Sequence, residues 1–223
     1  MRHKNVSATG VVSLLLFSTL PLLADKFADR VKESREVYEE LVNAPDKGVP
    51  QQLLKECKCI VVIPHVIKAA FGFGGRHGKG IVSCRNNRGN WSPPAFMKLS
   101  GGSFGLQIGG QSSDLVLFLM SEKSSKALLK SKFTLGGDAS VSAGPVGRTV
   151  EGNTDVTFRA EIYAYARSKG LFAGISLEGA KLGSDGTAIR KFYGSEIDPK
   201  VILFQHKVPK MPGEARKFVQ ALR

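Results

Sequence analysis

The glycine-rich stretch "AAFGFGGRHGKG", from Ala69 to Gly80, constrains the fold more than any other segment of the chain. Five of its twelve residues are glycine, and the apolar runs "CIVVIP" and "GIVSCR" flank it on either side. Short continuous apolar runs are typical of strands buried on both faces, and glycine clusters mark turns. The stretch therefore predicts two strands joined by a glycine-rich turn, with the cations Arg76 and Lys79 at its tip.

The same stretch does not fit a nucleotide-binding loop. The dinucleotide pattern G-x-G-x-x-G fails because His77 stands where the third glycine belongs, and the phosphate-loop pattern fails because Ile81 follows Gly80. Both motifs also need a helix after the glycines. Here the glycines lead into the apolar run "GIVSCR", which is typical of a strand.

The N-terminus has the layout of a secretory signal. Arg2 and Lys4 precede an apolar run from Val11 to Leu23, and the small residue Ala24 follows. This order predicts a signal peptide over residues 1–24, removed after Ala24, and a periplasmic or secreted protein. An uncleaved membrane anchor is the alternative, although the run is shorter than the roughly 20 residues of a spanning helix.

Residues 25–223 are long enough for one domain with a sizeable core. Helical spacing of apolar residues predicts an amphipathic helix from Lys26 to Asn43. Strict alternation from Asp155 to Arg167 predicts a half-buried strand that turns into "LFAGISLEG". Further short helices are expected at 50–57, 122–131, near 186–194 and at 213–222. The order favours an α+β fold in which helices pack on a curved antiparallel β-sheet or small barrel.

The chain is strongly basic, with 32 Lys and Arg against 19 Asp and Glu, a formal net charge of +13. Such a charge favours anionic partners, for example lipid headgroups, nucleic acid or acidic polymers. A basic surface that serves only solubility is the alternative. Nucleic acid is disfavoured as a partner, because no aromatic RNA-binding motif or zinc-finger spacing accompanies the charge.

Three cysteines in an exported chain allow at most one internal disulfide. If the strands that carry Cys59 and Cys84 pair, these two form the natural bridge, and Cys57 stays free. A metal site built from the three cysteines with His65 and His77 is conceivable, but its spacing matches no zinc pattern. We therefore expect no cofactor.

A serine hydrolase is the main catalytic alternative. The stretch "GGSFG" matches G-x-S-x-G with Ser103 at its centre, and it is followed by Asp114, Asp138 or Asp155 and then by His206. A nucleophile elbow needs a helix directly after the serine, whereas "LQIGGQ" is typical of extended chain. The sequence context therefore argues against this reading.

Two other residues have competing interpretations. Asp138 lies among small and apolar residues, which favours a structural pair with an arginine such as Arg148 over a functional carboxylate. Trp91, the single tryptophan, is either a core residue or an interfacial membrane anchor.

Several segments together resemble the SYLF domain family. They are "IPHVIKAAFGFGGRHGKGIVSCR", "WSPPAFMKLSGGSFGLQIGGQSSDLVLFLM", "LLKSKFTLGGDASVSAGPVGR", "YAYARSKGLFAGISLEG" and "FYG", which cover about Pro50 to Gly194. The resemblance implies a lipid-binding module without catalytic residues. Eukaryotic relatives are associated with phosphoinositide membranes and actin filaments, and an N-terminal amphipathic helix is implicated in membrane contact.

The sequence and this resemblance together predict a non-catalytic protein that binds anionic, phosphoinositide-like phospholipid surfaces, peripherally associated with a bacterial envelope. The residues expected to contact lipid are Lys26, Phe27, Arg30, Val31 and Lys32 of the first helix, then Arg76 and Lys79. The alternative for the helix is that its apolar stripe packs on the sheet. A protein-binding scaffold is the second functional hypothesis, and a hydrolase at Ser103 is the third.

Overall fold

The computed structural model describes residues 22–44, 48–130, 133–145, 159–168, 171–174 and 177–223. The helices in these ranges are α1 (Leu22–Val42), α2 (Gln51–Glu56), α3 (Glu122–Ala127), α4 (Gly186–Tyr193), α5 (Pro199–Gln205) and α6 (Gly213–Ala221). The strands are β1 (Cys59–Cys84), β2 (Ala95–Leu119), β3 (Phe133–Thr134), β4 (Val141–Ala143), β5 (Ile162–Ser168), β6 (Leu171–Gly174) and β7 (Lys181–Ser184).

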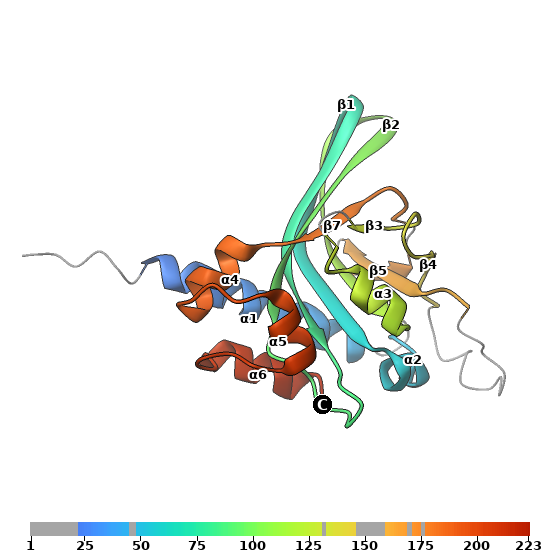
Figure 1. Ribbon diagram of the computed structural model, residues 1–223. Coiled ribbons are helices and arrows are strands. Elements are labelled where there is room, and N and C mark those ends of the chain that lie inside the picture. The colour runs from blue at the N-terminus through green and yellow to red at the C-terminus, as the bar shows by residue number, and fades with distance from the viewer. Residues whose placement is uncertain (1–21, 45–47, 131–132, 146–158, 169–170, 175–176) are drawn as a thin grey trace, which may run out of the picture.

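Two long strands, β1 and β2, form an antiparallel ribbon that doubles back on itself (Figure 1). Cys59 pairs with Leu119 at one end of the register, and Val82 pairs with Ala95 at the other. The glycine-rich stretch lies inside the single strand β1, so the expected pair of strands joined by a turn is wrong: the stretch stays paired with β2. No helix follows the glycines, which agrees with the rejection of a phosphate loop.

The remaining strands in the described part of the chain join this ribbon in one sheet, of which seven strands are described. β7 pairs with the first half of β2 and β5 with its second half, while β3, β4 and β6 extend the two sides. The pairing of β4 with β5 is parallel, whereas the other described strand pairs are antiparallel. The predicted α+β class, a curved sheet with packed helices, is confirmed.

The helices pack mainly on one side of the ribbon. Figure 1 shows α1, α4, α5 and α6 together on that side, while α3 and the short strands lie on the other. α1 contacts β1, α4 and α6, and α5 contacts both long strands. The expected helices α1, α2, α3, α4 and α6 are present, with Ser121 capping α3 by accepting a hydrogen bond from the Ser124 N–H at 3.0 Å.

Two details differ from the sequence expectations. The strand expected from Asp155 to Arg167 begins at Ile162 in the described residues, and both its faces are buried as far as Tyr165. Tyr165 packs edge-on against Phe118 and donates a hydrogen bond to the Pro145 carbonyl at 2.8 Å, so it belongs to the core. The helix α5 was not predicted, although Asp198 caps it by accepting from the Lys200 N–H.

The first 21 residues lie outside the described part of the chain, so most of the predicted signal segment does too. α1 begins at Leu22 and includes Ala24. None of the helices in the described part of the chain combines the length and apolar composition needed to cross a bilayer.

Candidate functional site: a groove between the first helix and the sheet

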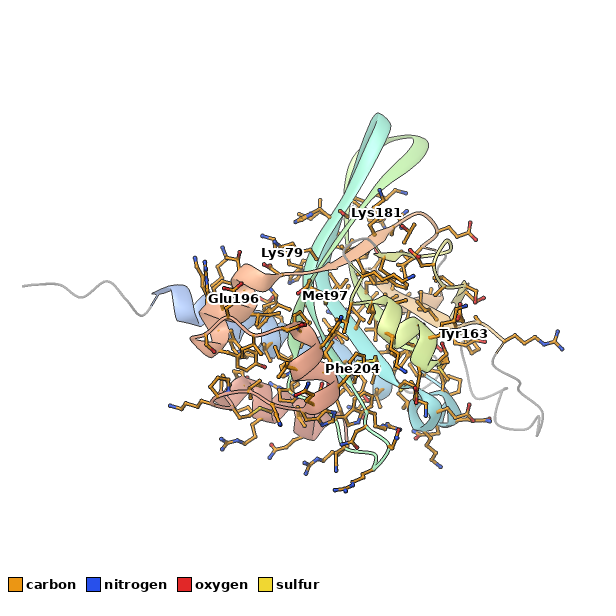
Figure 2. All side chains as sticks on the ribbon, viewed as in Figure 1. Lys79, Met97, Tyr163, Lys181, Glu196 and Phe204 are labelled. Atoms are coloured by element: carbon orange, nitrogen blue, oxygen red, sulfur yellow. A yellow bond between two sulfur atoms is a disulfide. The ribbon has the colours of Figure 1, made fainter. Side chains whose placement is uncertain are left out.

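An open groove of about 640 Å³ separates the N-terminal half of α1 from β1. Lys26 lines its helix side, and His77 and Lys79 line its strand side. The exposed Ile67, with 57% of its surface accessible, lies beside them. Figure 2 shows the Lys79 side chain on the helix-bearing side of the ribbon. Two predicted lipid contacts from distant parts of the sequence, Lys26 and Lys79, are thus brought to one surface.

The groove is not purely cationic. Asp29 and Glu33, one and two turns after Lys26 on α1, also line its helix wall. The strand wall carries no carboxylate among its lining residues, and His65 and His77 add imidazoles there. The positive side of the groove therefore comprises β1 and the N-terminal end of α1.

Three residues predicted to contact lipid are instead part of the core. Phe27 and Val31 are 7% and 0% exposed, and the Phe27 ring meets Phe96 edge-on at 6.0 Å. Arg30 is 9% exposed, and its guanidinium lies 5.5 Å from both the Phe27 and the Phe96 ring centroids. Phe27 and Val31 do not reach a membrane while α1 is docked on the sheet, because the apolar stripe is already covered. Arg30, although mostly buried, also lines the groove.

Arg30 also holds α1 against α4. Its Nη1 lies 3.6 Å from Asp185 Oδ2, and Lys98 Nζ lies 3.1 Å from the other oxygen of the same carboxylate. Asp185 is buried and also caps α4 by accepting from the Ala188 N–H at 3.2 Å. Burial lowers the pKa of Arg30 by removing water from its guanidinium, while Asp185 opposes this shift.

The remaining predicted contacts, Lys32, Arg76 and Lys79, fall on different surfaces. Lys32 is exposed on α1 outside the groove, 4.0 Å from Glu36. Alternation along β1 places Lys79 in the groove and Arg76 on the opposite face of the strand, where it lines a separate cavity. The two cations expected together at the turn are therefore separated by the sheet.

An ionic cluster that the sequence did not reveal fixes β1 where it bends. The His65 N–H donates to Asp114 Oδ1 at 2.9 Å, and His65 has a positive φ of 50° at a register shift between Ile63 and Val66. Arg167 of β5 donates to Asp114 Oδ2 from Nε and Nη2, at 2.8 and 2.7 Å, and also pairs with Glu40 of α1. Asp114 thus ties β1, β2 and β5 together.

The cysteines at the two ends of β1 are joined. A disulfide links Cys59 to Cys84, whose Cα atoms lie 4.0 Å apart because the strand doubles back. Cys57 is free and buried, and burial raises the pKa of its thiol to about 12. No cluster of three metal-ligating side chains exists among the described residues.

The hydrolase arrangement is not assembled among the residues that the structure describes. Ser103 lies inside β2, paired in register with Gly74, and the strand continues to Leu119 where an elbow would need a helix. Asp114 is bound to Arg167, while Asp155 lies outside the described residues. His206 follows α5 and lines a different pocket, beside Cys57 and Phe204, where burial lowers its pKa.

Asp138 and Trp91 both have structural contacts. Asp138 accepts a hydrogen bond from the Thr134 N–H at 2.7 Å and lies 3.5 Å from Lys130, and these contacts lower its pKa. The proposed partner Arg148 lies outside the described residues. Trp91 is buried, with the Arg85 guanidinium 4.5 Å from its ring centroid, so it is a core residue rather than a membrane anchor in this structure.

The fold and groove define a class of α+β proteins in which a curled sheet, with its N-terminal helix docked alongside, presents a basic groove. Comparison with known proteins identifies the family: Ysc84, described as Las17-binding protein actin regulator, matches residues 100–223. The chain belongs to this family, whose domain is also called SYLF.

Individual relatives agree with this assignment. The SH3 domain-containing YSC84-like protein 1 is 39% identical in Rattus norvegicus over 188 residues, which is 84% of this chain and 54% of that protein. The Xenopus laevis protein is 41% identical over 182 residues, 81% of this chain and 53% of its own length. Protein YSC84 of Saccharomyces cerevisiae is 38% identical over 161 residues, 71% of this chain and 34% of its own. The chain therefore spans about half or less of each of these relatives.

Proposed function

We propose that this protein binds anionic phospholipid surfaces, phosphoinositide-like in their headgroup charge, through the groove between α1 and β1, and that it does so without catalysis. The observation that carries the proposal is the meeting of Lys26 and Lys79 at one open groove beside the exposed Ile67. Cations near a charged bilayer each contribute about 1 kcal/mol of attraction, and an exposed aliphatic side chain adds shallow apolar contact.

In this proposal α1 stays docked on the sheet. Releasing it would expose Phe27 and Val31 and leave Asp185 without Arg30, and breaking a buried ion pair costs about 3–5 kcal/mol. Lys26 and Lys32 therefore contact headgroups from the exposed side of the helix, while Phe27, Arg30 and Val31 hold it in place.

Vesicle co-sedimentation tests the proposal. The purified chain is mixed with neutral or anionic vesicles at low and physiological salt, and we expect binding to the anionic vesicles that weakens as salt rises. The double variant Lys26→Glu/Lys79→Glu should bind at least about 30-fold more weakly, since two contacts of about 1 kcal/mol are lost.

The matched control is Lys200→Glu/Lys210→Glu, which makes the same change in net charge at exposed lysines away from the groove. It should keep most of the binding. Equal losses in both double variants would show that net charge alone drives association, and the groove would then have no special role.

The family description favours a second candidate, the binding of a protein partner. Because the description names an actin regulator, actin filaments are the first partner to test. A chain that co-sediments with filaments but with none of the vesicles would replace the lipid proposal with a scaffold role.

We also propose that the protein is exported to the periplasm or secreted. The Cys59–Cys84 disulfide supports this location, because such bonds persist in oxidising compartments. Sequencing the N-terminus of the protein purified from its native source tests it, and a mature chain that begins at Met1 would contradict removal of the signal.

A further inference from the structure

A second cavity, of about 400 Å³, lies on the face of β1 opposite the groove. Alternate residues of the strand line the two sites: Val66, Lys68 and Arg76 face this cavity, whereas Ile67, His77 and Lys79 face the groove. The cavity is bordered by residues of β1, β2, β5 and β6 and by Leu177. Its volume falls within the roughly 300–1,000 Å³ range of small-molecule sites.

The cavity is lined mostly by aliphatic side chains, and its charged residues are all positive. Leu115, Ala166, Leu171, Ala173 and Leu177 form the apolar wall with Val66. Among the described residues no carboxylate lines it, whereas carboxylates line both the groove and the pocket beside Cys57. Lys68 and Arg76 therefore face an apolar space with no opposing charge in its wall.

Arg76 has unused hydrogen-bonding capacity at this site. Its Nε is buried and has no hydrogen-bond partner within the described part of the chain. A buried polar group without a partner is destabilising, so a ligand that supplies an acceptor there gains affinity. The nearby polar side chains Gln111 and Ser168 already hydrogen bond to each other at 3.3 Å.

The exposed lining of the cavity includes a large apolar side chain beside the polar Lys68 and Gln111. Leu171 is 62% exposed, the most exposed large apolar side chain in the described residues, and it lies at the rim. An aliphatic ligand chain that enters the cavity would cover the exposed Leu171 side chain. A cation or a sugar would gain nothing from this apolar side chain.

We propose that this cavity binds one long-chain fatty acid, with its chain along Leu115, Leu171 and Leu177 and its carboxylate on Arg76 and Lys68. The planar guanidinium suits a carboxylate because two parallel N–H donors match its two oxygens. A cavity of this size favours a single-chain amphiphile over a two-chain phospholipid. The site is independent of the groove, because different residues on the opposite face of β1 form it.

Binding is measured with a fluorescent polyene fatty acid held below its micelle concentration, added to the purified full-length chain. We expect saturable binding of one molecule per chain. Arg76→Met keeps an unbranched apolar stem and removes the charged guanidinium, and it should weaken binding at least about tenfold, as expected for a lost charge-assisted hydrogen bond. Ala173→Phe, at an exposed position of the wall, should fill the cavity and abolish binding.

Two controls separate this site from its alternatives. The methyl ester of the same fatty acid should bind the wild-type chain at least about tenfold more weakly than the acid, a comparison that needs no variant to fold. Lys79→Met should leave fatty-acid binding unchanged even where it lowers vesicle binding. The proposal is overturned by absence of saturable binding, by equal affinity for acid and ester, or by full binding in a folded Ala173→Phe variant.

Discussion

The two ends of the β1–β2 ribbon use the same strand pairing for different purposes. At the base, Cys59–Ile63 and Gly80–Cys84 are buried on both faces, and a disulfide joins them. Along the arm, Val66–Lys68 and Arg76–Lys79 present a groove on one face and a cavity on the other.

The difference lies in what covers each face rather than in the backbone. The base is covered on the helix side by α1 and α5, so aliphatic side chains there contribute packing energy. The tip of the ribbon extends beyond these helices (Figure 1). The side chains of the arm line the groove beside α1 and the cavity on the opposite face, where they stay available for ligands. Substitutions at the base should therefore reduce stability, and substitutions in the arm should reduce binding.

The largest loss of stability is expected at Gly80. A Cβ added there would overlap Val62 O and lie 2.6 Å from Ile63 Cα, because the two halves of β1 touch at this glycine. Overpacking costs about 1–3 kcal/mol, and here the obstacle is backbone, so we expect Gly80→Ala to lower the free energy of unfolding by about 3 kcal/mol or more.

The matched control for that prediction is Gly75→Ala in the same strand. The nearest atom to a Cβ at this exposed glycine is Gly101 O at 3.8 Å, an ordinary contact. Urea unfolding should give a change within about 0.5 kcal/mol for Gly75→Ala. Similar losses at both glycines would show that the halves of β1 are not closely apposed at the base.

Removing the disulfide should have the next largest effect. The Cys59→Ser/Cys84→Ser variant frees a loop with a sequence separation of 25, which costs about 3 kcal/mol in the chain-entropy account. Thermal unfolding measures the loss. Cys57 supplies a second readout: its buried thiol, with a pKa raised to about 12, should react slowly with a thiol reagent at pH 8 in the native chain and faster in the variant. An unchanged unfolding midpoint would contradict a stabilising role.

Substitutions at the junction between the base and the arm should cause an intermediate loss of stability. Asp114→Asn keeps the volume of the side chain but removes the charge that receives Arg167, so we expect a loss of about 1.5–3 kcal/mol. Glu40→Gln removes the exposed partner of the same arginine and should cost about 1 kcal/mol or less. Denaturant unfolding of both variants gives the comparison, and a larger loss for Glu40→Gln would contradict the assignment of Asp114 as the organising carboxylate.

Local patterns predicted the base better than the arm. The run "CIVVIP" correctly indicated a strand buried on both faces, since only such a position accepts so many consecutive aliphatic residues. The groove could not be predicted, because Lys26 and Lys79 are brought together only by the docking of α1 on β1. The strand around Tyr165, expected to be half-buried, is instead buried on both faces, because Tyr165 packs against Phe118 of the neighbouring strand, a residue distant in sequence.

The helix α1 shows a further limit of sequence patterns. The sequence pattern of an amphipathic helix is the same whether its apolar stripe packs on a sheet or on a membrane. Phe27 and Val31 are compatible with both roles. In this structure both are buried and Phe27 contacts Phe96 edge-on, so the apolar stripe packs on the sheet. Neither Asp185 nor Phe96 is marked in the sequence as a partner of α1.

The smallest effect on stability is expected from a substitution at Ile67, and the buried Ile63 of the same strand provides the comparison. Both are isoleucines of β1, but Ile63 is fully buried and Ile67 is 57% exposed in the arm. Ile63→Ala should cost about 2–5 kcal/mol, whereas Ile67→Ala should change the free energy of unfolding by less than about 0.5 kcal/mol.

The exposed residue should instead affect binding: Ile67→Ser should weaken attachment to anionic vesicles and leave the fatty-acid affinity unchanged, because the side chain faces the groove and not the cavity. A destabilised Ile67→Ala variant would mean that the arm is packed like the base. The distinction between a base that stabilises the fold and an arm that binds ligands would then be wrong.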